Sequence, residues 1–134
     1  MIYLDNAATT KPNQDVLDTY VKVNQSLYSN ANSPHQAGLQ ADQLLQQTKK
    51  QIKDLFNLDG KFDIVFTSGA TESNNMALKG VAYKKKAFAN EIITSVLEHP
   101  SVLEVVRSLE TEGFIIKYVD VTDEGQIDLD HLKT

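Results

Sequence analysis

Strand-like and helix-like patterns alternate over the second half of the chain, and this alternation limits the possible folds more than any other feature. Apolar runs rich in β-branched and aromatic residues predict three strands, over residues 62–67, 91–95 and 114–119. Helical spacing predicts helices between them, over 71–86 and 100–111. Successive strand–helix–strand units form a parallel sheet with helices on its faces. We therefore expect an α/β fold with at least three parallel strands and flanking helices.

The first sixty residues show no such alternation. A short apolar piece, residues 2–4, leads into a polar stretch that ends near Pro12. Helical spacing of apolar residues then predicts two helices, over 14–27 and 35–57. The segment Tyr28–Pro34 separates them and is rich in turn-forming residues. The region of parallel strands is therefore preceded by an N-terminal segment and two helices.

The end of the sequence carries the start of one more element, since Ile127 and Leu129 begin a pattern that stops at Thr134. Three strands make a small sheet, and parallel sheets are normally covered on both faces. We therefore expect the chain to be the first part of a larger α/β protein. Apolar surface left without a partner should then cause self-association or poor solubility.

Composition excludes several classes of protein. The chain has 134 residues, 41% of them hydrophobic, which allows one sizeable core. Its net charge of −5 argues against a nucleic-acid surface, because phosphate backbones require concentrated positive charge. No apolar run approaches the ~18 residues that span a bilayer. The sequence has no cysteine, which excludes disulfides and a cysteine nucleophile within these residues and fits a cytoplasmic location.

The segment Thr67–Asn75 joins the first predicted strand of the alternating region to the following helix. Gly69 permits a close approach of the backbone to a ligand. Unpaired amides and the positive end of the helix dipole favour an anion at such a helix start. A phosphate could bind there to the amides of Gly69, Ala70 and Thr71 and to the Thr71 hydroxyl.

A simpler interpretation of the same segment is helix capping. Small polar residues are the usual N-cap choice, so Ser68 or Thr71 could cap the helix, with Glu72 or Asn74 completing the interaction. The segment lacks both the glycine–lysine pattern of a Walker loop and the three-glycine dinucleotide fingerprint. A nucleotide site is therefore disfavoured, and capping and phosphate binding both stay open on the residues alone.

His99 is the second candidate site residue. It follows a predicted strand and precedes Pro100 at a helix start, and ligands of α/β proteins collect at the carboxyl ends of parallel strands. A helix N-terminus disfavours the cationic form of histidine, which suits stacking of a neutral ring. Without further information, a capping or partly exposed histidine is the alternative.

The remaining histidines and charge clusters have simpler explanations. His35 opens a predicted helix and His131 lies near the end, so the histidines have no zinc-site spacing. Lys84–Lys86 falls late in a helix, where cations complement the helix dipole. The acidic residues between 120 and 130 lack the spacing of a calcium loop. We expect no metal site and no nucleic-acid partner.

Four short blocks occur in a specific order along the chain. They are Tyr3–Thr10, Ser33–Gly38, Thr67–Asn75 and Glu98–Val102. Together they resemble the amino-terminal third of class V aminotransferase-like enzymes, and most closely the cysteine desulfurases of the NifS/IscS type. The similarity runs from residue 2 to the end of the chain. No single block is specific, but four in this order and spacing are.

The resemblance implies an enzyme of fold type I that depends on pyridoxal 5′-phosphate (PLP) and is normally a homodimer. Such an enzyme takes sulfur from L-cysteine, leaves alanine, and passes a persulfide to an acceptor protein for iron–sulfur cluster assembly, tRNA thiolation or thiamin synthesis. The resemblance further implies that Ala70 and Thr71 bind the cofactor phosphate. It implies that His99 stacks on the pyridine ring and is a candidate for proton transfer. The segment Asp5–Thr10 is expected near the mouth of the active site.

The same resemblance gives a domain assignment: residues 1–14 belong with the small domain, and 15–134 form the first part of a truncated large PLP-binding domain. Four groups that the family needs are absent. These are the lysine that binds the cofactor covalently, the aspartate facing the pyridine nitrogen, the cysteine nucleophile and the arginine for the substrate carboxylate. The one arginine, Arg107, falls within a predicted helix. We therefore expect the chain alone to be inactive.

Two other functions compete with this one. The first is another class V PLP enzyme, such as a selenocysteine lyase, which the sequence of the downstream loop would distinguish. The second is a non-catalytic α/β module, or one half of a split enzyme, which association with a second polypeptide would reveal.

Overall fold

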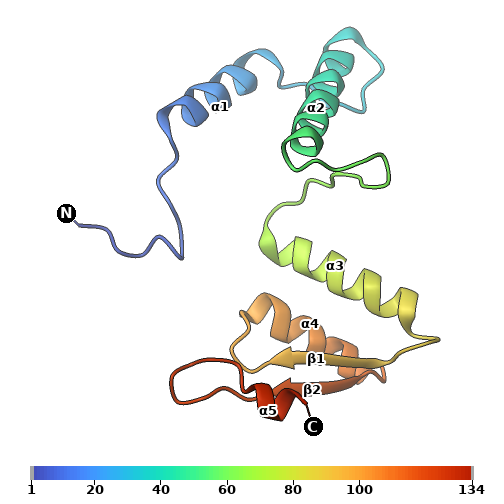
Figure 1. Cartoon of the computed structure of the whole chain (residues 1–134). Helices are drawn as coiled ribbons and strands as arrows, with labels where there is room; N and C mark the ends of the chain where they lie inside the picture. Colours follow the sequence, from blue (N-terminus) through green and yellow to red (C-terminus); the bar gives the residue numbers. More distant parts are fainter. Residues whose placement is uncertain (1, 134) are drawn as a thin grey trace. The chain divides into compact units, whose positions relative to one another are not determined.

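The computed structural model describes residues 2–133, and the chain forms two compact units, Met1–Val65 and Phe66–Thr134 (Figure 1). The first unit contains two helices, α1 (Gln14–Ser26) and α2 (Gln36–Leu55). The second unit contains the other elements: α3 (Ala70–Lys85), β1 (Glu91–Ser95), α4 (Pro100–Thr111), β2 (Ile115–Val119) and α5 (Leu129–Leu132). The domain boundary expected at residues 14 and 15 comes from the family resemblance and stays a prediction.

Local capping and one close contact explain the helices of the first unit. The Asn13 side chain accepts a hydrogen bond from the Asp15 amide at 3.0 Å and starts α1. His35 Nδ1 accepts from the Gly38 amide at 3.2 Å and starts α2, so this histidine has a structural role. Gly38 is buried, and a Cβ at this position would lie 2.2 Å from the Ser33 carbonyl oxygen. Glycine is therefore required where the preceding loop meets the helix.

The second unit is built around a parallel β–α–β unit. β1 and β2 pair in parallel, from Glu91 with Ile115 to Ser95 with Val119, and α4 connects them. This confirms the predicted α/β class, the parallel pairing and the bounds of both strands to within one residue. The core contains Leu109 and Val105 of α4, Ala82 of α3 and Phe114 before β2. Since burial of apolar side chains drives packing, this cluster fixes α3 and α4 against the strands.

The strand predicted at residues 62–67 is wrong, because this segment pairs with no strand within the described part of the chain. The Ile64 amide, which a ladder would use, instead donates to Asp63 Oδ1 at 2.8 Å. The Asp63 carboxylate also lies 3.5 Å from Lys53 Nζ and 3.9 Å from Lys49 Nζ. The Ile64 amide and these lysines lower the pKa of Asp63. Local contacts with α2 thus replace sheet pairing.

The acidic stretch near the end is a turn followed by a short helix. Val121 and Ile127 form an antiparallel bridge, and Gly125 adopts a φ of +77° within the turn that joins them. Asp128 caps α5 by accepting from the amides of Asp130 and His131, which lowers the pKa of Asp128. The further element expected after Ile127 is therefore the short helix α5. No group of metal-ligating side chains occurs in residues 2–133.

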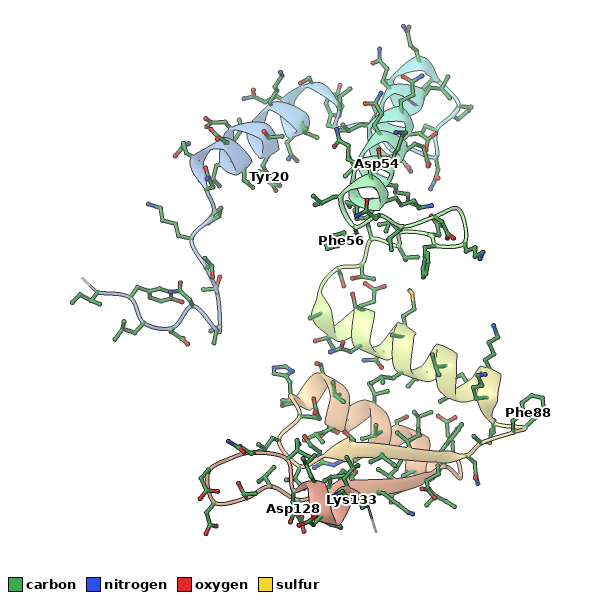
Figure 2. All side chains as sticks on the ribbon, in the orientation of Figure 1. Tyr20, Asp54, Phe56, Phe88, Asp128 and Lys133 are labelled. Carbon is green, nitrogen blue, oxygen red and sulfur yellow. The ribbon has the colours of Figure 1, made fainter. Side chains whose placement is uncertain are left out.

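Several large apolar side chains lie on the surface of both units. Tyr20 of α1 and Phe56 after α2 are 66% and 67% exposed, and Phe88 after α3 is 89% exposed (Figure 2). No side chain of α1 is buried. Among the described residues, no helix combines the length and the apolar character needed to cross a membrane.

Candidate functional site

The start of α3 has open backbone amides. Its N-cap, Gly69, has an extended backbone and makes no side-chain capping bond. The amides of Ala70 and Thr71 donate to no acceptor within residues 2–133. Neither Ser68 nor Thr71 is therefore the capping residue that one interpretation of the sequence proposed. Unpaired amides at the positive end of a helix dipole favour an anion.

Glu72, in the first turn of α3, holds the loop that precedes this helix. Its Oε2 accepts from both the amide and the hydroxyl of Ser68, each at 2.7 Å. These hydrogen bonds stabilise the carboxylate and lower the pKa of Glu72. The Thr67 and Ser73 hydroxyls lie 2.6 Å apart and also join the loop to the helix. Glu72 thus joins the preceding loop to the first turn of α3, but it makes no cap with Ser68 or Thr71, and the amides of Ala70 and Thr71 stay open.

The turn between β1 and α4 places His99. Buried Ser95, the last residue of β1, donates its hydroxyl to Glu98 Oε1 at 3.0 Å and accepts from the Leu97 amide at 3.3 Å. The Val96 amide donates to the Val119 carbonyl at 3.3 Å, next to the strand pairing. Bonds on both sides of the turn therefore restrain the backbone that leads into His99.

His99 is the N-cap of α4. Its Nδ1 accepts from the Ser101 amide at 3.1 Å, and Pro100 occupies the first turn, where a missing amide costs nothing. An amide can only donate, so Nδ1 must be the unprotonated nitrogen of the ring. The neutral imidazole therefore carries its proton on Nε2. His99 thus caps α4, which is the role predicted from the sequence as the alternative to cofactor binding. The same hydrogen bond fixes which ring nitrogen carries the proton.

A hydrogen bond between the two helices adds to this arrangement. Asn74 Nδ2 of α3 donates to Ser101 Oγ of α4 at 2.8 Å, and Ser101 Oγ lies 2.9 Å from His99 Nδ1. On the sequence alone, Ser101 has no predicted role of its own, and Asn74 is considered as a residue that could complete a helix cap. The two residues lie 27 positions apart, so no local pattern could have revealed their contact.

A cavity of about 320 Å³ lies between α3 and α4, beside both helix starts. It is lined by Thr71, Asn75, Lys79, His99, Pro100, Ser101, Glu104 and Val105. The fold thus brings together two of the three residues that the sequence singled out, Thr71 and His99. Ala70 does not line the cavity, although its amide belongs to the same helix turn as Thr71.

The arrangement can be compared with known proteins. The family model for aminotransferase class-V matches residues 2–134. The chain belongs to the class-V aminotransferase family. Among curated relatives, a mitochondrial cysteine desulfurase of Eremothecium gossypii is 44% identical over 98% of this chain. A NifS/IcsS protein homolog of Lactobacillus delbrueckii subsp. bulgaricus is 43% identical over 99% of it. The predicted resemblance to NifS/IscS-type proteins is thereby confirmed.

Solved structures agree with this class-V assignment. A structure titled NifS-like protein matches 96% of the chain with a TM-score of 0.84 and 34% identity. DndA from Streptomyces lividans matches 88% with a TM-score of 0.69 and 36% identity. The chain covers only part of these proteins, 27% and 34% of the two curated relatives and 35% and 33% of the two solved chains.

The residues around the cavity fit part of the cofactor expected for a class-V protein. Open amides at the start of α3 and the nearby Thr71 hydroxyl are donors of the kind that hold a phosphate. A neutral His99 offers an uncharged ring face to an aromatic cofactor. The described residues therefore suit the phosphate and the pyridine ring of PLP.

Proposed function

We propose that the chain supplies the phosphate-binding and ring-stacking part of a PLP-dependent cysteine desulfurase. The enzyme takes sulfur from L-cysteine, leaves alanine, and transfers a persulfide to an acceptor protein that serves iron–sulfur cluster assembly or thiolation. The observation that carries this proposal is that Thr71 and His99 line one cavity between the starts of α3 and α4. The names of the relatives, cysteine desulfurases among them, support the choice of reaction.

The start of α3 binds the cofactor phosphate in this proposal. The amides of Ala70 and Thr71 and the Thr71 hydroxyl donate to the phosphate oxygens, and the helix dipole adds a favourable potential. Charge-assisted bonds of this kind contribute more than neutral ones. The hydrogen bonds from Ser68 to the Glu72 carboxylate hold the loop in place, so that the amides of Ala70 and Thr71 need no rearrangement before the phosphate binds.

His99 faces the cofactor ring in this proposal. PLP, when bound, serves as an electron sink for bond cleavage at the substrate α-carbon. His99 contributes an uncharged stacking surface, since its Nδ1 is held by the first turn of α4. Its Nε2 carries a proton, and this is the atom from which His99 can take part in proton transfer.

Other parts of the site must come from outside this chain. The sequence contains no cysteine, so the persulfide forms on a cysteine that these residues do not supply. We propose that the chain is active only together with sequence corresponding to the rest of its relatives. We also propose a homodimeric enzyme in the cytoplasm. In it, residues 1–14 belong with the small domain and residues 15–134 with the large PLP-binding domain.

A fusion experiment tests this function. The chain is joined to the part of the Lactobacillus relative that follows the matched region, and alanine and sulfide are measured after addition of PLP, L-cysteine and a thiol reductant, which releases the persulfide sulfur as sulfide. We expect activity from the fusion and none from the chain alone. Thr71→Ala should weaken PLP binding about ten- to a hundredfold through lost phosphate hydrogen bonds, and His99→Ala should reduce turnover.

Thr48→Ala is the matched control, because its hydroxyl donates to the Leu44 carbonyl of its own helix and does not line the cavity. This variant should keep the activity and the PLP affinity of the fusion. A folded fusion that binds PLP but forms no alanine from L-cysteine would overturn the proposed reaction. Equal PLP affinity in the Thr71→Ala and Thr48→Ala fusions would overturn the proposed phosphate site.

A further inference from the structure

We infer that Asn74 and Ser101 are positioning residues that fix the tautomer and the orientation of the His99 ring. This inference rests on the proposed function, in which His99 faces the cofactor. Its basis is a chain of hydrogen bonds that runs from Asn74 Nδ2 to Ser101 Oγ at 2.8 Å, and from Ser101 to His99 Nδ1. None of these contacts depends on a bound ligand.

The donor and the acceptor in each of these hydrogen bonds follow from the chemistry of the groups. The Asn74 amide nitrogen can only donate, so Ser101 Oγ is the acceptor in that contact. The single hydroxyl proton of Ser101 is then free to point at His99 Nδ1, 2.9 Å away. The Ser101 amide donates to the same nitrogen at 3.1 Å. The hydroxyl and the amide of Ser101 therefore both donate to Nδ1. As a result, the proton of the neutral ring stays on Nε2.

Burial makes this arrangement specific. Ser101 is only 8% exposed and Asn74 is half-buried, so water competes poorly for the hydroxyl. The neighbouring Asn75 is also half-buried, but it donates to the Thr71 carbonyl within its own helix. Asn74 reaches a different helix instead. Its contact connects the phosphate-binding start of α3 with the histidine at the start of α4.

The consequence is a defined orientation of the imidazole. Nδ1 is committed to the first turn of α4, whereas Nε2 makes no hydrogen bond within residues 2–133. Nε2–H is therefore the side of the ring that remains available for a ligand in the cavity that His99 lines. Ser101 also lines this cavity, but the role inferred here for Ser101 and Asn74 is exerted through the His99 ring.

The test reads the tautomer directly. Two-bond proton–nitrogen correlation spectra of the imidazole are recorded on the ¹⁵N-labelled full chain, at a pH at which His99 is neutral. We expect the Nε2–H form to dominate in the unmodified chain. Ser101→Ala should raise the fraction of the Nδ1–H form about two- to tenfold, as expected for loss of one hydrogen bond. Asn74→Ala should raise it less, and Ser101→Thr should restore the original spectrum because it keeps the hydroxyl.

Two controls separate positioning from general loosening. Asn24→Ala removes an amide donor to the Tyr20 carbonyl in α1, and Thr111→Ala removes a hydroxyl donor to the Ser108 carbonyl in α4. Neither should change the His99 spectrum. Unchanged His99 tautomers in both Ser101→Ala and Asn74→Ala would overturn the inference, as would equal changes in the two controls.

The tautomer measurement needs no cofactor, so it can fail separately from the proposed function. If the tautomer shifts as expected but no pyridoxal-type phosphate binds, then Asn74 and Ser101 position His99 and the proposed function is wrong. If the ligand binds beside Thr71 but the tautomer does not respond to either substitution, then the proposed function stands and the positioning role is wrong.

Discussion

The carboxylate of Glu72 accepts hydrogen bonds from both the amide and the hydroxyl of Ser68, each at 2.7 Å. Both bonds lower the pKa of Glu72 below its usual value of 4.5. A depressed carboxyl pKa stabilises the folded loop above the unfolded pKa, and this contribution is lost as the pH falls through the folded pKa. The loop that leads into the proposed phosphate site is therefore sensitive to acid.

We expect the Ser68 amide signal to titrate with a midpoint below 4.5 as the pH is lowered, and Glu72→Gln to abolish this transition. Nuclear magnetic resonance of the amide between pH 6 and about 2.5 measures it, a range that covers ordinary carboxyl pKa values. A Ser68 midpoint at or above 4.5 would show that Glu72 is not stabilised by this contact.

Gly38→Ala should destabilise the first unit. A Cβ there would lie 2.2 Å from the Ser33 carbonyl oxygen and 2.9 Å from the Asn30 carbonyl oxygen, both backbone atoms that cannot move easily. We expect a loss of about 1–3 kcal/mol or more in the free energy of unfolding, measured by urea denaturation. Gly80→Ala is the matched control, because a Cβ there meets nothing within 4 Å in the interior of α3. It should stabilise by about 0.5–1 kcal/mol. Equal effects of the two substitutions would contradict the packing at Gly38.

Leu109→Ala should weaken the second unit strongly. Leu109 is fully buried and packs with Val105, Ala82 and Phe114. Removing a buried leucine side chain costs about 2–5 kcal/mol, because the cavity left behind collapses only partly. Leu55→Ala changes a leucine that is 75% exposed and should stay within about 0.5 kcal/mol. Urea denaturation measures the free energy of unfolding of both variants. Equal losses for Leu109→Ala and Leu55→Ala would contradict a core centred on Leu109.

The chain should associate with itself as its concentration rises. Tyr20, Phe56 and Phe88 expose large aromatic side chains (Figure 2), and apolar surface of this kind favours association in water. Light scattering across a dilution series should show a molar mass that increases with concentration, and a triple substitution of these residues by serine should reduce the increase. A constant monomer mass over the whole series is the opposing result.

The parts of the fold that the sequence predicts well are those set by local residues. Pro100 and the apolar spacing after it define α4 from Pro100 to Thr111, as expected. The strand expected at 62–67 failed because an apolar run contains no information about its partner, and the Asp63 carboxylate binds the neighbouring amide of Ile64 instead. Strand pairing is a tertiary property that periodicity does not encode.

The candidate site, like the fold, has parts that the sequence predicts and parts that it does not. Thr71 and His99 could be singled out because each stands at a helix start, a position with known chemistry. The contact of Asn74 with Ser101 could not be foreseen, since it depends on how α3 packs against α4. The choice of Ser68 or Thr71 as cap was wrong because Gly69 takes the N-cap position, and Glu72 bonds to Ser68 from the first turn.

The central claim is that the starts of α3 and α4 together form one site for a phosphorylated pyridine. The most direct measurement titrates pyridoxine 5′-phosphate, which has no aldehyde to react with lysines, into the ¹⁵N-labelled chain. Pyridoxine without phosphate is the control. We predict joint shifts of the Ala70 and Thr71 amides and of the His99 ring, with much weaker shifts for the control. Shifts that miss both helix starts, or that are equal for the two ligands, would contradict the account.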